Sequence, residues 1–386
     1  MAHISAIETY TVDVPLGRTF YASNRPIERA SQIMVKLFTD EGVVGWGESH
    51  GSPLPQVAAI IQDELAPLLI GEDPLQVEAL WQRMFARTTE RRSSQAEFSG
   101  ASLPKGAGKP QTMAAIGGLD TALWDLAGKL LEVPVWRLLG GFRSRIPTYV
   151  TGGYYPAEGE PDPVEEEFAG LVERGWRAVK LKAGGLSPRE DVERARRVRE
   201  SIGSEVELYV DASQGFSVKE AIEAGRGYEE LGVVWFEEPV HWYDDIAGLR
   251  MVADAVRIPI TSGESEYTKN GVRDLVVQGG ISICNFDVTK AGGITDGRKI
   301  AALLEVFHVE FSPHHAAHVQ ACLAAAVPNG RSVEMHADRD RDPLWEDLFS
   351  RKPEFVDGDL VLDETPGLGF DVDEDALARF GERYGT

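Results

Sequence analysis

The chain has 386 residues, 43% of them hydrophobic, and a formal net charge of −23. This length accommodates one large barrel and a smaller domain, and the apolar fraction is ordinary for a globular protein. The negative charge argues against polyanionic partners such as nucleic acids and anionic membrane surfaces. An anionic substrate would therefore need a local patch of Lys, Arg or metal ions to attract it.

Cys284 and Cys322 are the only cysteines. The first lies in a strand-like run and the second in a helix-like run, so both are predicted to be small buried hydrophobic residues. Two such residues make neither a disulfide framework nor a cysteine metal site. The N-terminus lacks the apolar core of a signal peptide, and nowhere do about 18 apolar residues run together. We therefore expect a cytoplasmic, reduced protein without a membrane partner.

The first part of the chain is predicted to form an α+β domain. Alternating apolar residues predict antiparallel strands at 4–14, 33–38 and 43–48, and helical periodicity follows them. The predicted helices are 57–69, 76–86 and 114–130, and polar loops are predicted at 19–27 and 91–111.

From about Pro147 the pattern changes to alternating strands and helices, such as the helices predicted at 188–202 and 294–307. The predicted strands are 148–152, 178–182, 207–211, 233–237, 259–264, 281–288, 309–314 and 331–335. Eight such units predict an α/β fold with a (β/α)8 TIM-type barrel over residues 131–359. An open doubly wound sheet is the alternative, but no glycine-rich nucleotide loop follows the first strand.

The C-terminal segment, residues 360–386, is acidic and is expected to leave the barrel. We predict that it packs back on the N-terminal domain. The chain would then consist of a capping domain, residues 1–130 completed by this tail, and the barrel.

Asp211, Glu237 and Glu264 stand at the ends of three consecutive predicted strands. In a parallel barrel, side chains at successive strand ends converge on one mouth. Carboxylate oxygens suit a hard divalent cation such as Mg²⁺. An acid after a strand also often caps the next helix, but capping hardly accounts for three in a row. We therefore predict that the three acids bind a metal ion.

Lys180 and Lys182 lie inside an apolar run one strand earlier. Strand side chains alternate, so both point the same way, toward the predicted metal. A solvated strand end is the alternative, but a charge in an apolar run needs a partner or a purpose. We expect each cation to depress the pKa of the other, which would make a neutral lysine base available near neutral pH. These cations indicate an anionic substrate.

Asp287 and His314 end the sixth and seventh predicted strands, so they are expected to be neighbours. An Asp that accepts a hydrogen bond from one imidazole nitrogen fixes the tautomer and raises the basicity of the other nitrogen. Without Asp287, His314 would be interpreted as a structural histidine. His315 and His318 are expected at solvent or at the edge of the substrate, and Glu334 is expected to point to the mouth or the core.

Several motifs follow one another in order along essentially the whole chain. They are ALWDLAGKLLEVPVWRLLGG at 122–141, the Lys180-x-Lys182 pair, VDASQG at Asp211, FEEP at Glu237, SGE at Glu264, FDVTKAGGIT at Asp287, SPH at His314 and PGLGF at Pro366. This ordered set resembles the enolase superfamily, in the branch named after mandelate racemase. The resemblance implies one Mg²⁺ per active site, a small-molecule carboxylate substrate and a homo-oligomer, either a dimer or an octamer.

The resemblance also implies a role for each matching residue. Lys182 would be an acid/base on one face of the substrate, and His314, paired with Asp287, the acid/base on the other. Lys180 and Glu334 would hold the substrate carboxylate. The implied metal ligands are Asp211, Glu237 and Glu264, and the capping-domain loops that shape specificity carry Tyr21, Asn24, Arg25 and His50.

Two positions differ from relatives. In a sister branch typified by muconate cycloisomerase, the base is a lysine where this chain has Asp287, and Lys290 lies three residues too late to replace it. Where some sugar-acid dehydratases carry a His general acid, this chain has Ser213, which is predicted to contact substrate. A hydroxyl is a poor proton donor, so His314 or Lys182 would protonate a departing hydroxyl.

The shared first step in such enzymes is removal of the proton next to a carboxylate, with the metal stabilising the ene-diolate. We predict a hydro-lyase that dehydrates a sugar acid to a 2-keto-3-deoxy acid. The alternative is a racemase or epimerase of a 2-hydroxy acid that uses the same Lys/His pair. The polar and basic loop residues favour the hydroxyl-rich substrate; they are Asn24, Arg25, His50, Arg91 and Arg92.

Two further hypotheses lie outside this class. A retaining glycosidase could use Glu237 or Glu238, but it calls for neither three metal ligands nor paired lysines. A barrel that binds metal without turnover would not need Lys182, His314 and Asp287.

Overall fold

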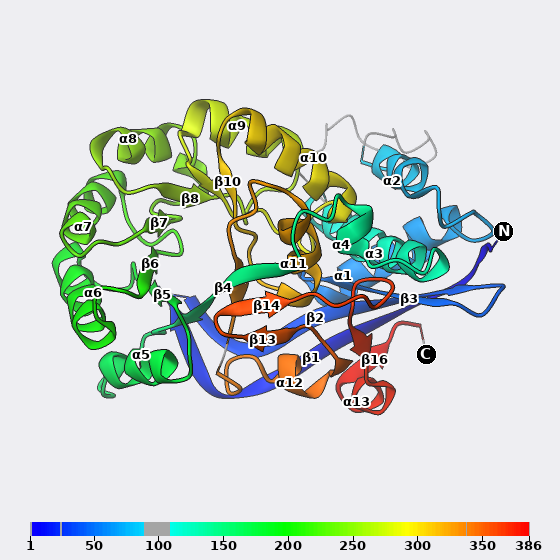
Figure 1. Cartoon of the computed structure of the whole chain (residues 1–386), viewed down its shortest axis with the longest axis horizontal. Helices are drawn as coiled ribbons and strands as arrows, with labels where there is room; N and C mark the ends of the chain where they lie inside the picture. Colours follow the sequence, from blue (N-terminus) through cyan, green and yellow to red (C-terminus); the bar gives the residue numbers. More distant parts are fainter. Residues whose placement is uncertain (1, 24, 89–108, 337, 386) are drawn as a thin grey trace, which may run out of the picture.

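The computed structural model describes residues 2–23, 25–88, 109–336 and 338–385. An antiparallel sheet with flanking helices lies beside a ring of parallel strands that is surrounded by helices (Figure 1). Within the described ranges, no helix is both long and apolar enough to cross a membrane. Both cysteines are buried, as their sequence context predicts.

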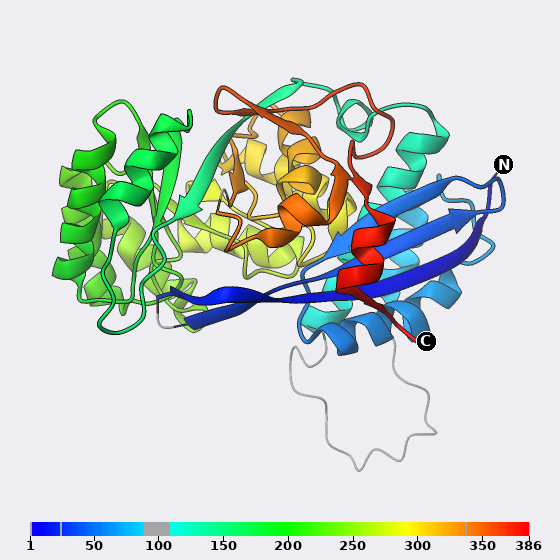
Figure 2. The same cartoon turned by 90° about the horizontal axis from the view of Figure 1, so that it is seen from below.

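The N-terminal sheet has the strand order β16-β1-β2-β3. Its strands are β1 (Ile4–Ala22), β2 (Arg25–Thr39), β3 (Val44–Ser49) and β16 (Gly381–Arg383). In the segment predicted as a loop, Phe20–Ala22 and Arg25–Ile27 instead continue the β1–β2 pairing past a register shift, as far as Ala22 opposite Arg25. The tip of this hairpin is fixed by the barrel, because the Ser23 hydroxyl donates to the Gly184 carbonyl at 2.7 Å. Figure 2 shows the blue hairpin reaching across to the barrel.

The helices of the N-terminal part differ from prediction at their ends. The helix predicted at 57–69 is divided into α1 (Leu54–Ala59), a π-helical turn η1 (Ile60–Leu65) and a 3-10 turn η2 (Ala66–Leu68). Pro67 lies in the last piece and cannot donate the backbone hydrogen bond that a continuous α-helix needs. The other two helices are α2 (Val77–Ala86) and α3 (Lys109–Leu130).

Helix α3 packs directly on strand β3 through glycine. A Cβ atom on Gly47 would overlap the Gly118 carbonyl and would lie 2.5 Å from the Ala122 amide nitrogen. On its other side, a Cβ on Gly117 would lie 2.7 Å from the Val288 carbonyl, in the loop that follows β9. Because these glycines have no side chains, the sheet, the helix and the barrel loop can pack closely against one another.

Two buried aspartates of α3 add polar links. Asp120 accepts from the Thr295 amide at 2.8 Å, at the start of barrel helix α10. Asp125 accepts from the amides of Trp46 in β3 and Leu368 in the C-terminal segment, each at 2.8 Å. Helix α3 thus joins the N-terminal sheet, the barrel and the tail.

The barrel strands within the described ranges form one parallel ladder from β4 to β10, and β11 pairs with β4. Between β10 and β11, the Arg331 amide donates to the Phe311 carbonyl at 2.7 Å, and Phe311 bridges to Gly330. The strands are β4 (Arg145–Gly152), β5 (Ala178–Lys182), β6 (Glu207–Asp211), β7 (Trp235–Glu237), β8 (Ile260–Ser262), β9 (Ile283–Cys284), β10 (Glu310–Phe311) and β11 (Val333–Met335).

The last strands are shorter than predicted, so Glu264, Asp287 and His314 lie on the loops that follow β8, β9 and β10. In this fold the loops after the strands form the functional face. The positions of all eight strands agree with the sequence pattern: seven predicted runs each contain one strand, and the eighth, 148–152, forms the end of β4, which begins earlier at Arg145.

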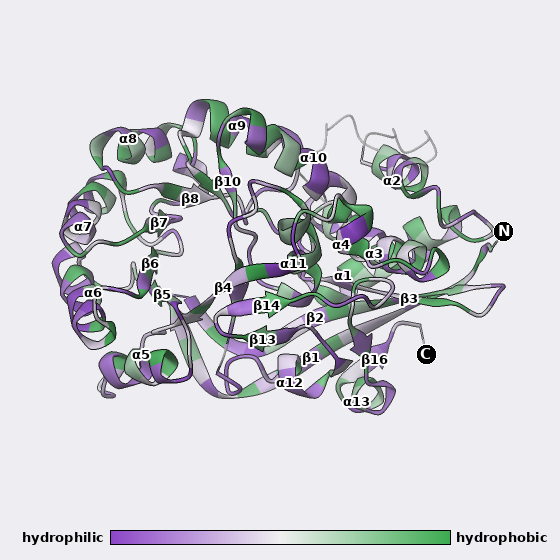
Figure 3. Cartoon of the chain, in the orientation of Figure 1, coloured by the Kyte–Doolittle hydropathy of each residue, from purple (hydrophilic) through white to green (hydrophobic). Residues whose placement is uncertain are grey.

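Helices surround the ring, and hydrophilic and hydrophobic residues alternate along them (Figures 1 and 3). They are α4 (Val135–Leu138), α5 (Val164–Glu173), α6 (Pro188–Ile202), α7 (Val218–Glu230), η3 (Trp242–Asp244), α8 (Ala247–Ala255), α9 (Lys269–Asp274), η4 (Leu275–Gly279), α10 (Gly293–Val306) and α11 (Ala317–Ala326). Inside the ring, Tyr209 stacks on Trp235 with ring centroids 3.6 Å apart, and Tyr149 packs against both. These aromatic rings fill the barrel interior below its mouth.

The C-terminal segment runs from the barrel to the N-terminal sheet. It contains α12 (Pro343–Asp347), β12 (Phe349–Arg351), β13 (Glu354–Val356), β14 (Asp359–Val361), β15 (Asp371–Val372) and α13 (Glu374–Phe380). Strand β14 pairs with β4, and β16 pairs with β1 (Figure 2). The domain boundaries given above stay a prediction.

We predict that Gly47→Ala destabilises the protein by roughly 1–3 kcal/mol, because the added methyl group must push β3 away from α3. Thermal unfolding should show a Tm several degrees lower. Gly17→Ala is the control, since Gly17 has no atom within 4 Å of its Cβ position. Equal Tm values for the two variants would contradict the proposed close packing.

Candidate active site

Lys180 is a fully buried cation in the barrel. Its Nζ lies 2.8 Å from Glu237 Oε1 and 2.9 Å from Glu334 Oε1. Asp211 is a third acid at 3.9 Å. An unpaired buried charge would be very costly, so these acids from β6, β7 and β11 are what allow a lysine at this position.

Lys182, two residues further, points to the same mouth. Its Nζ lies 2.5 Å from Asp211 Oδ2 and 3.5 Å from the Ser213 hydroxyl. The predicted depression of the lysine pKa values is wrong for this arrangement. Burial lowers the pKa of each lysine, but the nearby carboxylates outweigh burial and raise both above the ordinary value. The acids, rather than the neighbouring ammonium group, dominate the field at each lysine.

The three predicted metal ligands lie around this pair of lysines. Asp211 and Glu237 are register partners on adjacent strands, and Glu264 follows the next strand. Their oxygens do not all lie within 4.8 Å of one another. Each carboxylate turns to a cation of its own, because Lys182 holds Asp211, Lys180 holds Glu237, and Lys290 lies 3.2 Å from Glu264.

The donor set nevertheless fits a hard divalent cation. Glu237 Oε2 is buried and has no hydrogen-bond partner among the described residues. Burial, only partly offset by Lys180, raises the pKa of Glu237 well above its ordinary value. A cation at this oxygen would supply the missing partner, and three carboxylates are oxygen ligands of the kind Mg²⁺ prefers. Their role as ligands of one ion stays a prediction.

Asp287 and His314 are neighbours, as predicted. His314 Nδ1 lies 2.9 Å from Asp287 Oδ2, and Asp287 Oδ1 accepts from the Gln320 side chain at 2.9 Å. The other ring nitrogen, Nε2, lies 3.3 Å from Glu264. Burial opposes ionisation of Asp287, but hydrogen bonding and the charge of His314 keep its pKa below the ordinary value. The aspartate therefore stays ionised and orients the imidazole toward the mouth.

Lys290 is closer to the site than the sequence indicated. Although it does not replace Asp287, its side chain reaches Glu264. The turn after Asp287 brings it there: the Thr289 and Lys290 amides donate to Asp287 Oδ1, at 2.8 and 3.3 Å. The sequence signal was only its place in FDVTKAGGIT, which does not reveal where a flexible side chain ends.

Glu48 was missed by the sequence analysis and lies fully buried between two histidines. Its Oε1 is 2.5 Å from His50 Nε2, and its Oε2 is 2.8 Å from His318 Nε2. His318 therefore does not lie at solvent, because Glu48 and the rings of Phe349 and Phe370 enclose it. It lines the pocket beside Glu334, so the alternative position at the substrate edge stays a prediction. His50 lies against His315, with ring centroids 4.6 Å apart.

Two of the remaining loop candidates, Tyr21 and Arg25, lie near the end of the β1–β2 hairpin. The Tyr21 carbonyl accepts from the Tyr155 amide at 2.9 Å, which fastens the tip to the barrel, and Arg25 is exposed. Asn24, Arg91 and Arg92 lie outside the described residues. The structure thus places Tyr21 and Arg25 at the barrel edge and does not bring them to Lys182 or His314 by any direct contact.

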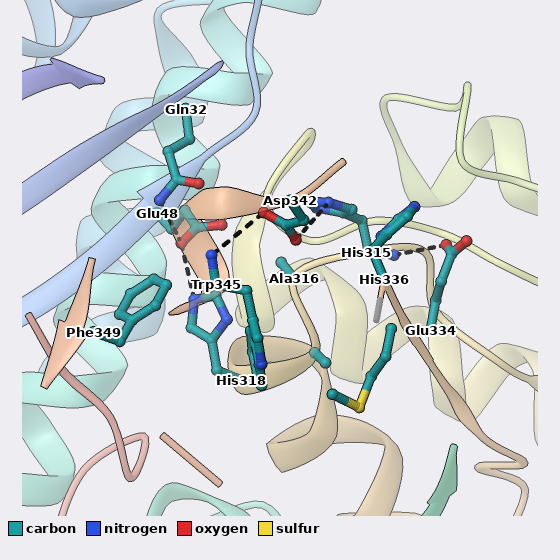
Figure 4. A pocket seen from close by; sticks show the side chains of 12 residues that line it. Gln32, Glu48, His315, Ala316, His318, Glu334, His336, Asp342, Trp345 and Phe349 are labelled. Atoms are coloured by element: carbon teal, nitrogen blue, oxygen red, sulfur yellow. Dashed lines mark hydrogen bonds and ion pairs between the residues drawn. The ribbon is translucent and has the colours of Figure 1, made fainter. Parts of the chain in front are cut away.

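A pocket of about 350 Å³ opens beside Glu334. Figure 4 shows His315, His336 and Asp342 on its wall near Glu334, with Glu48 and His318 further along. This polar pocket joins the barrel mouth to β2 and β3 of the N-terminal sheet, so the sheet contributes to the site.

The arrangement is suited to proton transfer next to an anion. Lys182 and His314 come from different sides of the ring, and both charges lower the pKa of Glu264 and of Glu334. An amine and an imidazole therefore surround the same small volume. Lys180 adds a fixed positive charge that can stabilise a developing oxyanion.

Comparison with known proteins gives two family matches. The description "Mandelate racemase / muconate lactonizing enzyme, N-terminal domain" matches residues 6–140. The description "Enolase C-terminal domain-like" matches residues 164–376.

Individual relatives cover most of the chain. An arabinonate dehydratase of Saccharolobus solfataricus is 32% identical, over 88% of both chains. A D-galactarolactone cycloisomerase of Agrobacterium fabrum is 30% identical, over 98% of both chains. The crystal structure of a mandelate racemase/muconate lactonizing enzyme from a marine actinobacterium, in complex with magnesium, is 31% identical with a TM-score of 0.86, covering 99% of this chain and 100% of that one.

We predict that Glu48→Gln destabilises the protein by roughly 2–3 kcal/mol near neutral pH, because two charge-assisted hydrogen bonds are weakened. Burial opposes ionisation of Glu48, but His318 and His50 outweigh it and lower its pKa well below the ordinary 4.5. Burial also lowers the pKa of His50, but Glu48 outweighs burial and raises it above 6.5. The lowered pKa of Glu48 contributes stability above pH 4.5, and the raised pKa of His50 contributes stability below pH 6.5. The loss of stability in Glu48→Gln should therefore be largest between these two pH values.

Urea unfolding of both proteins at several pH values measures this difference. The stability difference should shrink progressively as the pH falls from 4.5 through the lowered native pKa of Glu48, and also as the pH rises from 6.5 through the raised native pKa of His50. The exposed Glu28→Gln is the control. A difference that does not vary with pH would show that packing, not charge, holds Glu48.

Proposed function

Because the chain belongs to the mandelate racemase/muconate lactonizing enzyme family of the enolase superfamily, we propose that it is a Mg²⁺-dependent dehydratase of a sugar acid. The family contains hydro-lyases and isomerases, such as the dehydratase and the cycloisomerase described above. The proposed reaction removes the proton next to the substrate carboxylate and then expels the β-hydroxyl. The product is a 2-keto-3-deoxy acid.

One observation carries the proposal. Lys182 on β5 is bonded to Asp211, and the Asp287-paired His314 after β10 lies with its Nε2 3.3 Å from Glu264, so the two groups reach the acids of the mouth from different parts of the ring. A substrate held between them would have a proton acceptor on either side of its α-carbon. General acid–base catalysis by two positioned groups typically accounts for 10²–10⁴-fold in rate each.

Asp211, Glu237 and Glu264 would hold the metal ion. When bound, the ion would neutralise charge that develops on the substrate carboxylate as the α-proton leaves. Lys180, fixed by Glu237 and Glu334, would add a positive charge to the same carboxylate. Placing these charges in a buried site strengthens them relative to water.

The proton balance of the reaction needs one acceptor and one donor. Lys182 or His314, whichever is unprotonated, takes the α-proton as the carbon–hydrogen bond breaks. The opposite group donates a proton to the β-hydroxyl as its carbon–oxygen bond breaks, so the hydroxyl leaves as water. The resulting enol then rearranges to the keto acid. Asp287 keeps the imidazole oriented throughout, because it is bonded to His314 Nδ1 at 2.9 Å.

Ser213 supports a donor role for His314 or Lys182. Its hydroxyl lies 3.3 Å from Asp211 Oδ1 and 3.5 Å from Lys182 Nζ, so it is engaged with the proposed metal ligand and base. A hydroxyl in this position can orient Lys182 but does not itself supply a proton at neutral pH. Glu238, the glycosidase candidate, turns instead to Gln214 and Ser265.

The test is a screen of sugar acids with the full-length protein and Mg²⁺ in D₂O, followed by NMR and mass spectrometry. We expect loss of water and a keto product from at least one acid. Lys182→Ala and His314→Asn should each lower the rate by about 10²–10⁴, whereas the exposed control His308→Asn should not. Deuterium at the α-carbon of an otherwise unchanged or inverted acid would contradict dehydration and identify a racemase or epimerase.

Metal removal gives a second prediction. Chelation should abolish turnover, and MgCl₂ should restore it. Glu264→Gln should raise the Mg²⁺ concentration needed for half-maximal activity at least about tenfold, because it removes one charged oxygen ligand. Full activity after exhaustive chelation, or an unchanged Mg²⁺ requirement in Glu264→Gln, would contradict the assignment of the acids.

A further inference from the structure

Five of the eight histidines of the chain gather beside the barrel mouth. The His315 ring is the centre of the group. It lies 4.6 Å from the ring of His50, 5.0 Å from that of His336 and 5.6 Å from that of His314. The proposed reaction uses His314 alone, and Glu48 accounts for His50 and His318. His315 and His336 have no role in it.

These two histidines share their side of the pocket with a carboxylate. Donor atoms of His315, His336 and Asp342 all lie within 4.8 Å of one another. Figure 4 shows the three side chains converging beside Glu334. Two imidazoles and one carboxylate are a common ligand set for divalent transition metals and zinc.

The three side chains lie close together, but they do not supply hydrogen-bond partners for one another's polar atoms. His315 Nδ1 is buried and has no hydrogen-bond partner among the described residues. His315 Nε2 lies 3.9 Å from Asp342 Oδ2, which is too long for a hydrogen bond. Asp342 uses its other oxygen to accept the Trp345 amide at the start of α12. Buried polar atoms are usually paired, so this arrangement calls for a small partner between the side chains.

The backbone is strained to present His315. His315 and Ala316 both adopt left-handed conformations, with φ values of 50° and 41°. The His315 amide is held there by Glu334 Oε2 at 3.1 Å. Two successive non-glycine residues in this region carry a conformational cost, and such strain concentrates at functional sites.

The neighbours of His336 also suit a ligand. The Tyr154 hydroxyl contacts its Nε2 at 3.1 Å, a contact of the kind that orients metal-binding imidazoles. Burial, together with neighbouring positive groups, lowers the pKa of both His315 and His336 well below the ordinary value. Arg341 and Lys182 are nearby positive charges that oppose a cation, while Glu334 favours one.

We propose that His315, His336 and Asp342 form a second divalent-metal site, of the zinc and cobalt class, distinct from the all-carboxylate site for magnesium. A tetrahedral ion with bonds of about 2.0–2.2 Å needs neighbouring donors roughly 3.3–3.5 Å apart. Three protein ligands leave the remaining coordination position to water or another ligand in the pocket.

The test is binding of ZnCl₂ or CoCl₂ to the full-length, metal-stripped protein in a large excess of MgCl₂. We expect one Zn²⁺ per chain by elemental analysis after desalting, and visible absorption bands of four- or five-coordinate Co²⁺. His315→Asn and His336→Asn should each weaken binding at least about tenfold, since loss of an outer contact alone costs that much. None of these measurements requires turnover. The second metal site can therefore be disproved while the proposed function holds, and the proposed function can be disproved while the second metal site holds.

His308→Asn is the matched control, because His308 is exposed and also has a left-handed φ, 57°. Asn is among the residues that tolerate this conformation, so neither His308→Asn nor His315→Asn should disturb folding, as circular dichroism can check. The proposal is overturned if wild-type protein retains no Zn²⁺ in excess Mg²⁺. It is equally overturned if His315→Asn and His336→Asn bind like wild type, or if Zn²⁺ is lost in Glu264→Gln but kept in both histidine variants.

Discussion

The mouth of the barrel concentrates acidic charge where water screens it poorly, and much of the structure follows from balancing that charge. Asp211, Glu237 and Glu334 are almost completely buried, and Glu264 is little exposed. Lys180, Lys182 and Lys290 are drawn among them. Each carboxylate raises the pKa of the lysine beside it, so the lysines stay charged despite burial. A dication would enter this balance as one more positive charge, releasing a lysine for proton transfer.

The second constraint is the close contact that fixes the N-terminal sheet over this mouth. Glycines on β3 and α3 let sheet, helix and barrel loop approach one another. The His50 amide donates to the Thr289 carbonyl at 3.1 Å, two residues after Asp287. The sheet therefore touches the loop that orients His314. A change in β3 should therefore alter the position of the His314 imidazole through these contacts.

Strand positions and the Asp287–His314 pair could be predicted because both depend on local pattern and on the order of strands around a ring. Alternation places one side chain per strand end, and adjacent strands bring their ends together. The lysine pKa values could not be predicted in this way. Their sign depends on how many acids reach each ammonium group in space, and Glu334 comes from a strand about 150 residues later in the chain. The partnership of Glu48 with His318 is likewise a long-range contact without a sequence period.

The surroundings of the pocket histidines also could not be predicted from local sequence pattern. His315 was expected at solvent or the substrate edge because it follows a strand end in a loop, yet left-handed backbone turns its ring inward to His336 and Asp342. The two proposed sites then differ in kind. One offers only carboxylate oxygens beside ammonium groups, which suits a hard ion. The other offers two imidazoles and one carboxylate, which suits a softer ion. Because affinity for nitrogen ligands rises along the first-row metals while Mg²⁺ prefers oxygen, ligand chemistry alone can keep two ions apart in adjoining sites. Glu334 lies between them, bonded to Lys180 through one oxygen and to the His315 amide through the other. Occupancy of one site would therefore affect the other through this side chain.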